Sequence, residues 1–244
     1  AVITTVVASH LGYFSSVAEI ADAKAEIFLG LEPGGHAVLN RDNEYFDRLS
    51  AAAHKAGIGD IVSFGKSPGS DVNLERSVLH ADCSCITANI QGEPVIYKLG
   101  VPGEHMVLNS LAALAAVKLA GADLARASLA LAAAQPAKGR GVQTTLRAPG
   151  GNILLIDESY NANPVSVRAA LALLKRAEPG KQGRRIAVLG DMLELGEQAA
   201  DLHAELSGAV DETKVDVLYA CGPLMAHLWN KTPPHRRGAY AEKS

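Results

Sequence analysis

The run from Asp157 to Pro164 reads Asp-Glu-Ser-Tyr-Asn-Ala-Asn-Pro and combines two carboxylates, an aromatic hydroxyl and two amides. It directly follows the apolar stretch 152–156, which predicts a buried strand, and Pro164 is a residue type that opens helices. In open α/β sheets, ligands bind beyond the carboxyl ends of the strands. We therefore expect this run to form a nucleotide and substrate site.

Three other positions carry side chains that suit a phosphate or nucleotide ligand. His105 and Asn109 are four residues apart in a predicted helix, so both can reach one ligand, although a capped helix start explains them equally well. Arg140 supplies a permanent positive charge within a glycine-rich break, where arginines are also often structural. Each position is a candidate, and none is specific by itself.

Two further candidates lie near the start of the chain. His10 ends the first predicted strand at the carboxyl edge of its sheet, but a lone histidine is more often a loop or surface residue. Lys24 lies on an alanine-rich helix, where a lysine is usually a surface charge.

Asp191 is a candidate in the second half of the chain, because it follows a predicted strand. The segment lacks the Gly-x-Gly-x-x-Gly fingerprint of a dinucleotide site, so Asp191 can equally be an ordinary turn residue.

Composition excludes several classes of protein. The 244 residues are 48% hydrophobic and 20% charged, which is enough apolar material for one large or two modest domains. A formal net charge of −3 gives no basic surface for nucleic acid, and no apolar stretch is long enough to cross a bilayer. Three cysteines without metal-ligand spacing predict reduced thiols. We expect a soluble, cytoplasmic protein that binds no nucleic acid and inserts in no membrane.

The elements expected in the first part of the chain alternate between helices and strands. Ser16 and Glu19 fit a capping box for a helix that extends to about Phe28, and Asp42 is the expected cap of the next helix. Strands are expected at 36–39 and 61–64, an antiparallel patch at 72–99, and helices at 104–119 and 123–133. This pattern predicts a parallel sheet covered by helices.

A second alternating unit follows the break at 135–141, and we place the domain boundary near Arg147. Its expected elements are strands at 153–156, 186–189 and 215–220 and helices at 165–177, 198–210 and 224–229. The predicted fold class is thus α/β. A partial, ATPase-type central domain with a parallel sheet (1–146) precedes a Rossmann-like, doubly wound C-terminal domain (147–244).

Taken in order, four segments resemble the cytoplasmic Mur ligases. They are Ser9-His10-Leu11-Gly12 with the helix around Lys24, the Gly-x-His-x-x-x-Asn-x-x-Ala-Ala helix from Gly103, the run from Leu155 to Pro164, and Val188–Gly196 with His203 downstream. The third segment resembles most closely the members that add D-alanyl-D-alanine to UDP-N-acetylmuramoyl-tripeptide in bacterial peptidoglycan synthesis. Co-occurrence of all four in order is far more specific than any one alone.

The resemblance implies an ATP-dependent ligase that forms an acyl phosphate and lets an amine attack it, with Mg²⁺ neutralising the phosphates. It implies that His10 and carbamylated Lys24 are catalytic metal ligands. It implies ATP contacts from His105, Asn109, Arg140 and Asp157, and dipeptide contacts from Tyr160, Asn161 and Asn163. We expect a monomer.

Departures from the family pattern limit what this chain is expected to do alone. No Gly-x-x-x-x-Gly-Lys-Ser/Thr loop occurs in it, Glu158 stands where the family usually has Asp, and Thr5 replaces an expected Asn. We therefore predict a fragment that lacks the N-terminal domain and the phosphate loop and does not turn over. The alternatives are another Mur-like ligase, such as folylpolyglutamate synthase, and a non-catalytic nucleotide-binding module. A nicotinamide oxidoreductase is less favoured because the glycine fingerprint is missing.

Overall fold

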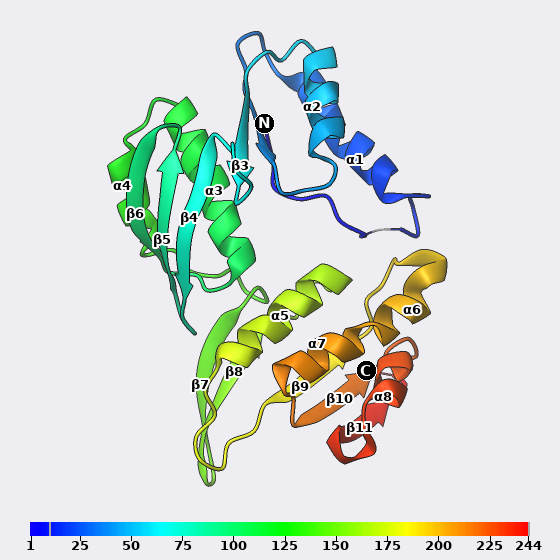
Figure 1. Ribbon diagram of the computed structural model, residues 1–244. Helices are drawn as coiled ribbons and strands as arrows, with labels where there is room; N and C mark the ends of the chain where they lie inside the picture. Colours follow the sequence, from blue (N-terminus) through cyan, green and yellow to red (C-terminus); the bar gives the residue numbers. More distant parts are fainter. Residues whose placement is uncertain (10, 244) are drawn as a thin grey trace. The chain divides into compact units, whose positions relative to one another are not determined.

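The structure is a computed structural model that describes residues 1–9 and 11–243. The chain divides into two compact units, Ala1–Val7 with Ser16–Gln135 and Ala8–Ser15 with Pro136–Ser244 (Figure 1). Both units combine helices with parallel strands, so the predicted α/β class is confirmed. The main division, at Gln135/Pro136, precedes the boundary predicted near Arg147. Within the described residues, no helix is both long and apolar enough to span a membrane.

The first unit is built on one mixed sheet of six strands in the order β1-β2-β3-β4-β5-β6. Pairing is parallel from β1 to β4 and antiparallel from β4 to β6, as the sequence predicted for the 72–99 region. The strands are β1 (Val2–Ile3), β2 (Ala37–Asn40), β3 (Ile61–Gly65), β4 (Val72–Leu79), β5 (Ser84–Ile90) and β6 (Glu93–Leu99).

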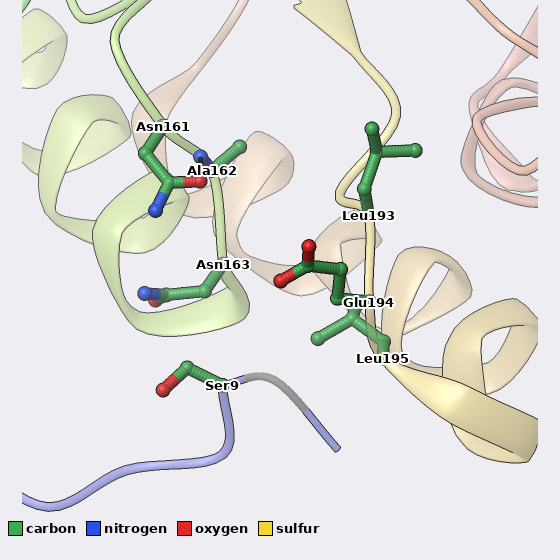
Figure 2. A pocket seen from close by; sticks show the side chains of 7 residues that line it. All are labelled: Ser9, Asn161, Ala162, Asn163, Leu193, Glu194 and Leu195. Carbon is green, nitrogen blue, oxygen red and sulfur yellow. Dashed lines mark hydrogen bonds between the residues drawn. The ribbon is translucent and has the colours of Figure 1, made fainter. Parts of the chain in front are cut away.

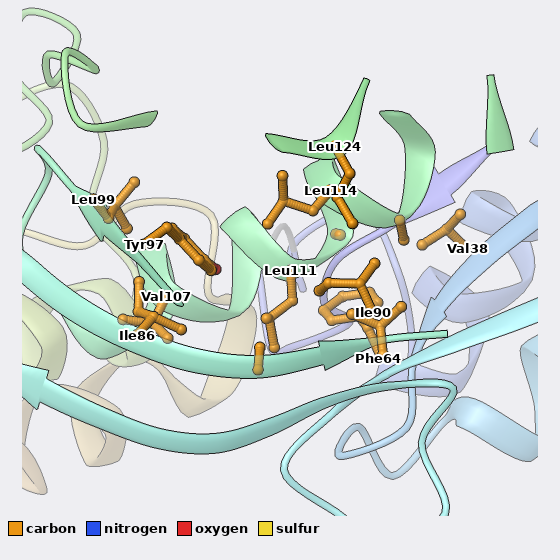
Figure 3. Close-up of a cluster of buried hydrophobic side chains, with 14 of the residues drawn as sticks. Val38, Phe64, Ile86, Ile90, Tyr97, Leu99, Val107, Leu111, Leu114 and Leu124 are labelled. Carbon is orange, nitrogen blue, oxygen red and sulfur yellow. The ribbon is translucent and has the colours of Figure 1, made fainter. Parts of the chain in front are cut away.

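Helices of the first unit are α1 (Val17–Ala25), the 3-10 helix η1 (Glu26–Gly30), α2 (Phe46–Lys55), α3 (Glu104–Leu119) and α4 (Leu124–Leu131). The hydroxyl of Ser16 accepts a hydrogen bond from the Glu19 N–H, so the predicted cap of α1 is confirmed. Helix α3 packs along β2 to β5, and α4 packs on β6. Figure 3 shows Val107 of α3 beside Ile86 of β5, and Leu111 of the same helix belongs to the same main core.

The cap predicted for α2 is wrong. Helix α2 begins at Phe46 after Tyr45, which makes no side-chain cap. The Asp42 carboxylate instead accepts hydrogen bonds from the backbone N–H groups of Lys66 (2.7 Å) and Ser67 (2.8 Å), just beyond β3. The reason is tertiary, because β3 brings these amides within reach of the end of β2, and a short carboxylate can cap a loop as well as a helix.

In the second unit, β9 (Ile186–Gly190), β10 (Val217–Cys221) and β11 (Arg237–Ala241) form a parallel sheet in the order β11-β10-β9. The sequence pattern predicted that the strand at 153–156 belongs to this sheet, and that prediction is wrong. That segment lies in β8 (Gly151–Asp157), which forms an antiparallel hairpin with β7 (Val142–Ala148). The physical reason is the turn at Pro149-Gly150, which favours pairing of the 151–157 strand with the strand directly before it in the chain. The prediction did not take this turn into account.

The prediction that this strand is buried is also wrong, since Ile153, Leu154 and Leu155 of β8 are each close to half exposed.

The helices of this unit are α5 (Pro164–Arg176), α6 (Ala199–Ala204), α7 (Leu206–Thr213) and α8 (Ala226–Lys231), with 3-10 turns η2 (Gly196–Gln198) and η3 (Pro234–Arg236). The core of the unit joins α5, α7 and α8 to the parallel sheet through fully buried residues such as Leu206, Leu218 and Leu228.

Candidate functional site

The polar run after β8 forms a tight turn centred on Asp157. The carboxylate of Asp157 accepts hydrogen bonds from the Ser159 hydroxyl (2.6 Å) and the Ser159 N–H (3.1 Å). The hydroxyl contact is the main reason that the pKa of Asp157 lies below its ordinary value, and the Ser159 amide adds to it. Asp157 is therefore an ionised acceptor at neutral pH.

Arg140 and Tyr160 stack on each other next to this turn. The guanidinium of Arg140 lies 4.4 Å from the centre of the Tyr160 ring, a cation–π distance. Two backbone hydrogen bonds hold the segments together, from Tyr160 N–H to Gly139 C=O (3.1 Å) and from Gly141 N–H to Asp157 C=O (2.8 Å). The structure thus brings Arg140, which the sequence singled out on a different segment, to the run that contains Asp157 and Tyr160.

Gly139 is what allows this close approach. Its φ is +72°, and a Cβ placed on it would lie 2.9 Å from the Tyr160 nitrogen. Both facts exclude a larger residue without local rearrangement. The half-buried Glu158 has a raised pKa, mainly because of burial and secondarily because of the neighbouring Asp157, while Arg140 acts in the opposite direction.

Asn163 has a structural role in addition to any role in binding. Its Oδ1 accepts hydrogen bonds from the N–H groups of Val165 (3.0 Å) and Ser166 (2.9 Å), and the Ser166 hydroxyl closes a capping box at the start of α5. Asn161 Oδ1 similarly accepts from the Ala162 N–H (2.9 Å). Asn163 Oδ1 thus uses both of its acceptor positions on the backbone, so the Nδ2 group of Asn163 is the part of this side chain left to contact a ligand, as a donor.

A pocket of about 250 Å³ opens beside these two asparagines, wholly within the second unit. Its wall is formed by Ser9, Asn161, Ala162, Asn163, Leu193, Glu194 and Leu195. Figure 2 shows the Glu194 carboxylate extending from the 193–195 segment toward the 161–163 segment across the pocket. Sequence reasoning missed Ser9 and Glu194 as lining residues. The only signal was their membership of two motifs that lie far apart in the chain.

The loop that carries Glu194 is anchored from both sides. The fully buried imidazole of His203 accepts a hydrogen bond from the Met192 N–H (2.9 Å) at Nε2, and its Nδ1 lies 2.6 Å from the Ala199 carbonyl oxygen. Asp191 accepts hydrogen bonds from the N–H groups of Leu224 (3.2 Å) and Met225 (2.7 Å), so it holds the segment that leads into α8. Asp191 is therefore a structural turn residue here.

In the first unit, His105 and Asn109 lie on exposed positions of α3 in its first turns. The preceding Gly103 has a φ of +113°, and a Cβ on it would lie 2.9 Å from the His105 ring. Glu104 forms an ion pair with Lys66 next to them. The two candidates thus share a solvent-facing stretch of helix that a planar base could reach.

Lys24 is exposed in the last turn of α1, and His10 lies outside the described residues. Across the described chain, no group of three or more His, Cys, Asp or Glu side chains is arranged to hold a metal ion. An unmodified lysine ammonium is not a metal ligand. The described residues therefore do not by themselves fit a magnesium site, and we derive no step through one.

Comparisons with known proteins agree on one family. Residues 1–117 match the Mur ligase middle domain, and residues 143–242 match the Mur ligase, glutamate ligase domain. The UDP-N-acetylmuramoyl-tripeptide--D-alanyl-D-alanine ligase of Mycobacterium tuberculosis is 34% identical over 233 residues, covering 91% of this chain and 43% of the relative.

Solved structures give the same result. A MurF crystal structure from Acinetobacter baumannii matches with a TM-score of 0.87 and 29% identity over 99% of this chain and 50% of its own. MurF from Thermotoga maritima, solved in complex with ADP, shares the fold at a TM-score of 0.75 and 22% identity, covering 100% of this chain and 58% of its own. The chain spans about half the length of the curated relatives it matches. Because two successive regions match two domains of one family, the chain belongs to the Mur ligase family and carries its middle and C-terminal domains.

Proposed function

We propose that the protein containing this chain is an ATP-dependent ligase that joins D-alanyl-D-alanine to UDP-N-acetylmuramoyl-tripeptide in peptidoglycan precursor synthesis. The observation that carries the proposal is the turn after β8, where Arg140, Asp157 and Tyr160 meet beside a pocket lined by Asn161 and Asn163. Relatives that bear this activity in their names match 91% of the chain, which supports the same assignment.

The reaction requires stabilisation of negative charge. ATP phosphorylates the terminal carboxylate of the tripeptide, and the amine of the dipeptide attacks the resulting acyl phosphate with release of phosphate. Arg140 is always charged and suits a phosphate oxygen. The ionised Asp157 suits the ribose hydroxyls as an acceptor. Stacking on Tyr160 restricts the guanidinium to few orientations, which favours a preorganised contact.

Tyr160, Asn161 and Asn163 are proposed to bind the dipeptide. Their hydroxyl and amide donors suit its terminal carboxylate, and the pocket excludes ligands much larger than a short peptide, since about 250 Å³ lies below the ~300–1,000 Å³ of sites for drug-sized molecules. In the first unit, His105 and Asn109 are proposed to contact adenine. Excluding water around these groups would protect the acyl phosphate from hydrolysis.

Magnesium, with His10 and carbamylated Lys24 as ligands, stays part of this proposal. Carbamylation would turn the exposed ammonium of Lys24 into an oxygen donor of the kind Mg²⁺ prefers. Incubation with ¹³C-bicarbonate followed by ¹³C NMR tests it. We expect a carbamate resonance in the wild type that is absent from Lys24→Ala and retained in Lys55→Ala, a lysine of α2.

The experiment that tests the proposed function is ADP release that depends on both UDP-N-acetylmuramoyl-tripeptide and D-alanyl-D-alanine. It compares this chain with a version extended through the upstream reading frame. We expect release from the extended protein alone, because no phosphate-loop sequence occurs in these 244 residues. Omission of either substrate is the control.

If the extended protein is folded and contains a phosphate loop but releases no ADP with the two substrates, the proposal is contradicted. A non-catalytic nucleotide-binding module would then be favoured, provided that ATP still binds. Release with glutamate and a folate in place of the two substrates would favour a folylpolyglutamate-type ligase. We also propose a cytoplasmic, monomeric protein, for which fractionation and sedimentation are the direct tests.

A further inference from the structure

Glu158 is a titratable group at the turn after β8 to which the proposed function gives no role. It lies between Asp157 and Ser159 in the chain, and its side chain is half buried. We infer that Glu158 takes up a proton when an anionic group binds to Arg140, so that protonation of this carboxylate strengthens phosphate binding at the turn. The inference deepens the proposed function and rests on it for the assignment of Arg140 to a phosphate.

The first step of the argument is that the Glu158 carboxylate is confined without a partner. Within the described residues, it makes no hydrogen bond and no ion pair. A Cβ placed on Gly141 would lie 3.1 Å from Glu158 Oε1 and 4.0 Å from a methyl group of Leu173 on α5. The carboxylate therefore lies against the Gly141 backbone. Partial burial without hydrogen-bond donors disfavours the charged form of a carboxylate.

The second step concerns the charges that act on this carboxylate. Burial, the largest cause, and the neighbouring Asp157 raise the pKa of Glu158, and Arg140 lowers it. The Ser159 hydroxyl, at 2.6 Å, keeps Asp157 ionised at neutral pH, and Leu173 carries no charge. Among the described residues, Arg140 is thus the group that favours the ionised form of Glu158.

The third step is that an anion has access to Arg140. The side chain is exposed, and its stacking on the Tyr160 ring uses the face of the guanidinium. The N–H donors lie in the plane of the guanidinium, which is where oxyanions bind. A phosphate group can therefore bind at the edge of the guanidinium while the stack persists.

The fourth step is the effect of such an anion on Glu158. An anion on Arg140 offsets the positive charge of the guanidinium and adds a negative charge near the carboxylate. Both changes raise the pKa of Glu158, so this group binds a proton more readily. Because the coupling is reciprocal, the protonated form of Glu158 also binds the anion more tightly. Anion affinity should therefore be highest below the pKa of Glu158 and fall as the pH rises through it.

The test is ¹³C NMR of the side-chain carboxyl groups of the 244-residue protein, titrated with acid in sodium sulfate and in sodium chloride of equal ionic strength. Sulfate is the probe because, unlike phosphate, it keeps one charge from neutral to mildly acidic pH. We expect Glu158 to titrate at a higher pH in sulfate. Sulfate affinity, measured from the Arg140 side-chain N–H resonance, should be about two- to fivefold lower above this titration than below it, as for a partly exposed charge pair.

Glu158→Gln is the decisive variant, because its neutral amide replaces the protonated carboxyl group. Its sulfate affinity should equal that of the wild type in acid and should not change with pH. Arg140→Gln should abolish the effect of sulfate on the titration of Glu158. The matched control is Glu178→Gln, which makes the same change on an exposed residue after α5 and should bind sulfate as the wild type does at each pH.

Three results would each overturn the inference. The first is an identical titration of Glu158 in sulfate and in chloride. The second is a sulfate affinity of Glu158→Gln that depends on pH as strongly as that of the wild type. The third is an effect of sulfate on Glu158 that persists in Arg140→Gln.

Failure of the inference differs from failure of the proposed function. If the extended protein makes product and its KM for ATP has the same pH dependence in the wild type and in Glu158→Gln, the function holds and the role of Glu158 is wrong. If the extended protein is inactive but sulfate shifts the titration of Glu158 through Arg140, the proton-coupled anion site holds and the assigned reaction is wrong.

Discussion

The imidazole of His203 accepts a hydrogen bond of 2.9 Å from the backbone N–H of Met192, and both residues are fully buried. The nearby Ala199 carbonyl at 2.6 Å from Nδ1 fixes the tautomer with the proton on Nδ1. A histidine on α6 thus sets the conformation of the loop that carries Glu194.

His203→Ala should lower the free energy of unfolding by about 2–4 kcal/mol, because it opens a cavity and leaves a buried N–H without an acceptor. Urea unfolding followed by circular dichroism measures the change. The control His227→Ala removes an exposed imidazole from α8 and should stay within about 0.5 kcal/mol of the wild type. Equal effects of the two variants would show that the Met192 contact is not important.

Asn163→Ala should destabilise the second unit by about 0.5–2 kcal/mol, since it removes the N-cap of α5. Asn163→Asp keeps an oxygen acceptor at the positive end of the helix dipole, and its stability should be close to that of the wild type. Thermal melts of the three proteins give the comparison. A destabilised aspartate variant would argue that the Nδ2 group, rather than the cap, stabilises the loop.

Gly139→Ala should disturb the stack of Arg140 on Tyr160, because the new methyl would lie 2.9 Å from the Tyr160 nitrogen. Gly150→Ala is a matched control, with a φ of +97° but no atom within 4 Å of the added carbon. Both variants should lose about 1–2 kcal/mol to backbone strain. Only Gly139→Ala should shift the Tyr160 amide and ring resonances in NMR spectra, and unaltered Tyr160 signals would refute the proposed tight approach.

The hydrogen bonds of the Asp42 carboxylate should make the stability of the first unit depend on pH. Partial burial raises the pKa of Asp42, but the hydrogen bonds from Lys66 and Ser67 outweigh it, so the pKa in the folded protein is below its ordinary value. The stabilisation is therefore present at neutral pH, above the pKa of the unfolded chain. It is lost as the pH falls through the folded-state pKa.

Asp42→Asn should accordingly cost about 1 kcal/mol at pH 7, allowing for solvent screening of an exposed group, and less in acid. Urea titrations of wild type and variant across the acid range provide the measurement. If the difference in unfolding free energy between wild type and variant does not become smaller in acid, the negative charge of Asp42 does not contribute to stability.

Local sequence signals predicted the elements whose partners are near in the chain. Ser16 capped α1 as expected, since the pattern spans three residues, and the alanine- and leucine-rich stretch 104–119 matched α3 to the residue. The antiparallel strands of 72–99 followed from their turns. By contrast, the placement of β8 was wrong because the Pro149-Gly150 turn competed with a distant parallel pairing.

By itself, the sequence determined the chemical character of the site, because the types and spacing of Asp157, Tyr160, Asn161 and Asn163 are properties of one short run. Only the tertiary structure decided which distant side chains join them. Arg140 reaches Tyr160 through backbone pairing of two segments, and Glu194 reaches the pocket because buried Met192, Leu195 and His203 fix its loop. Such contacts depend on packing between residues far apart in the chain, which local periodicity does not encode.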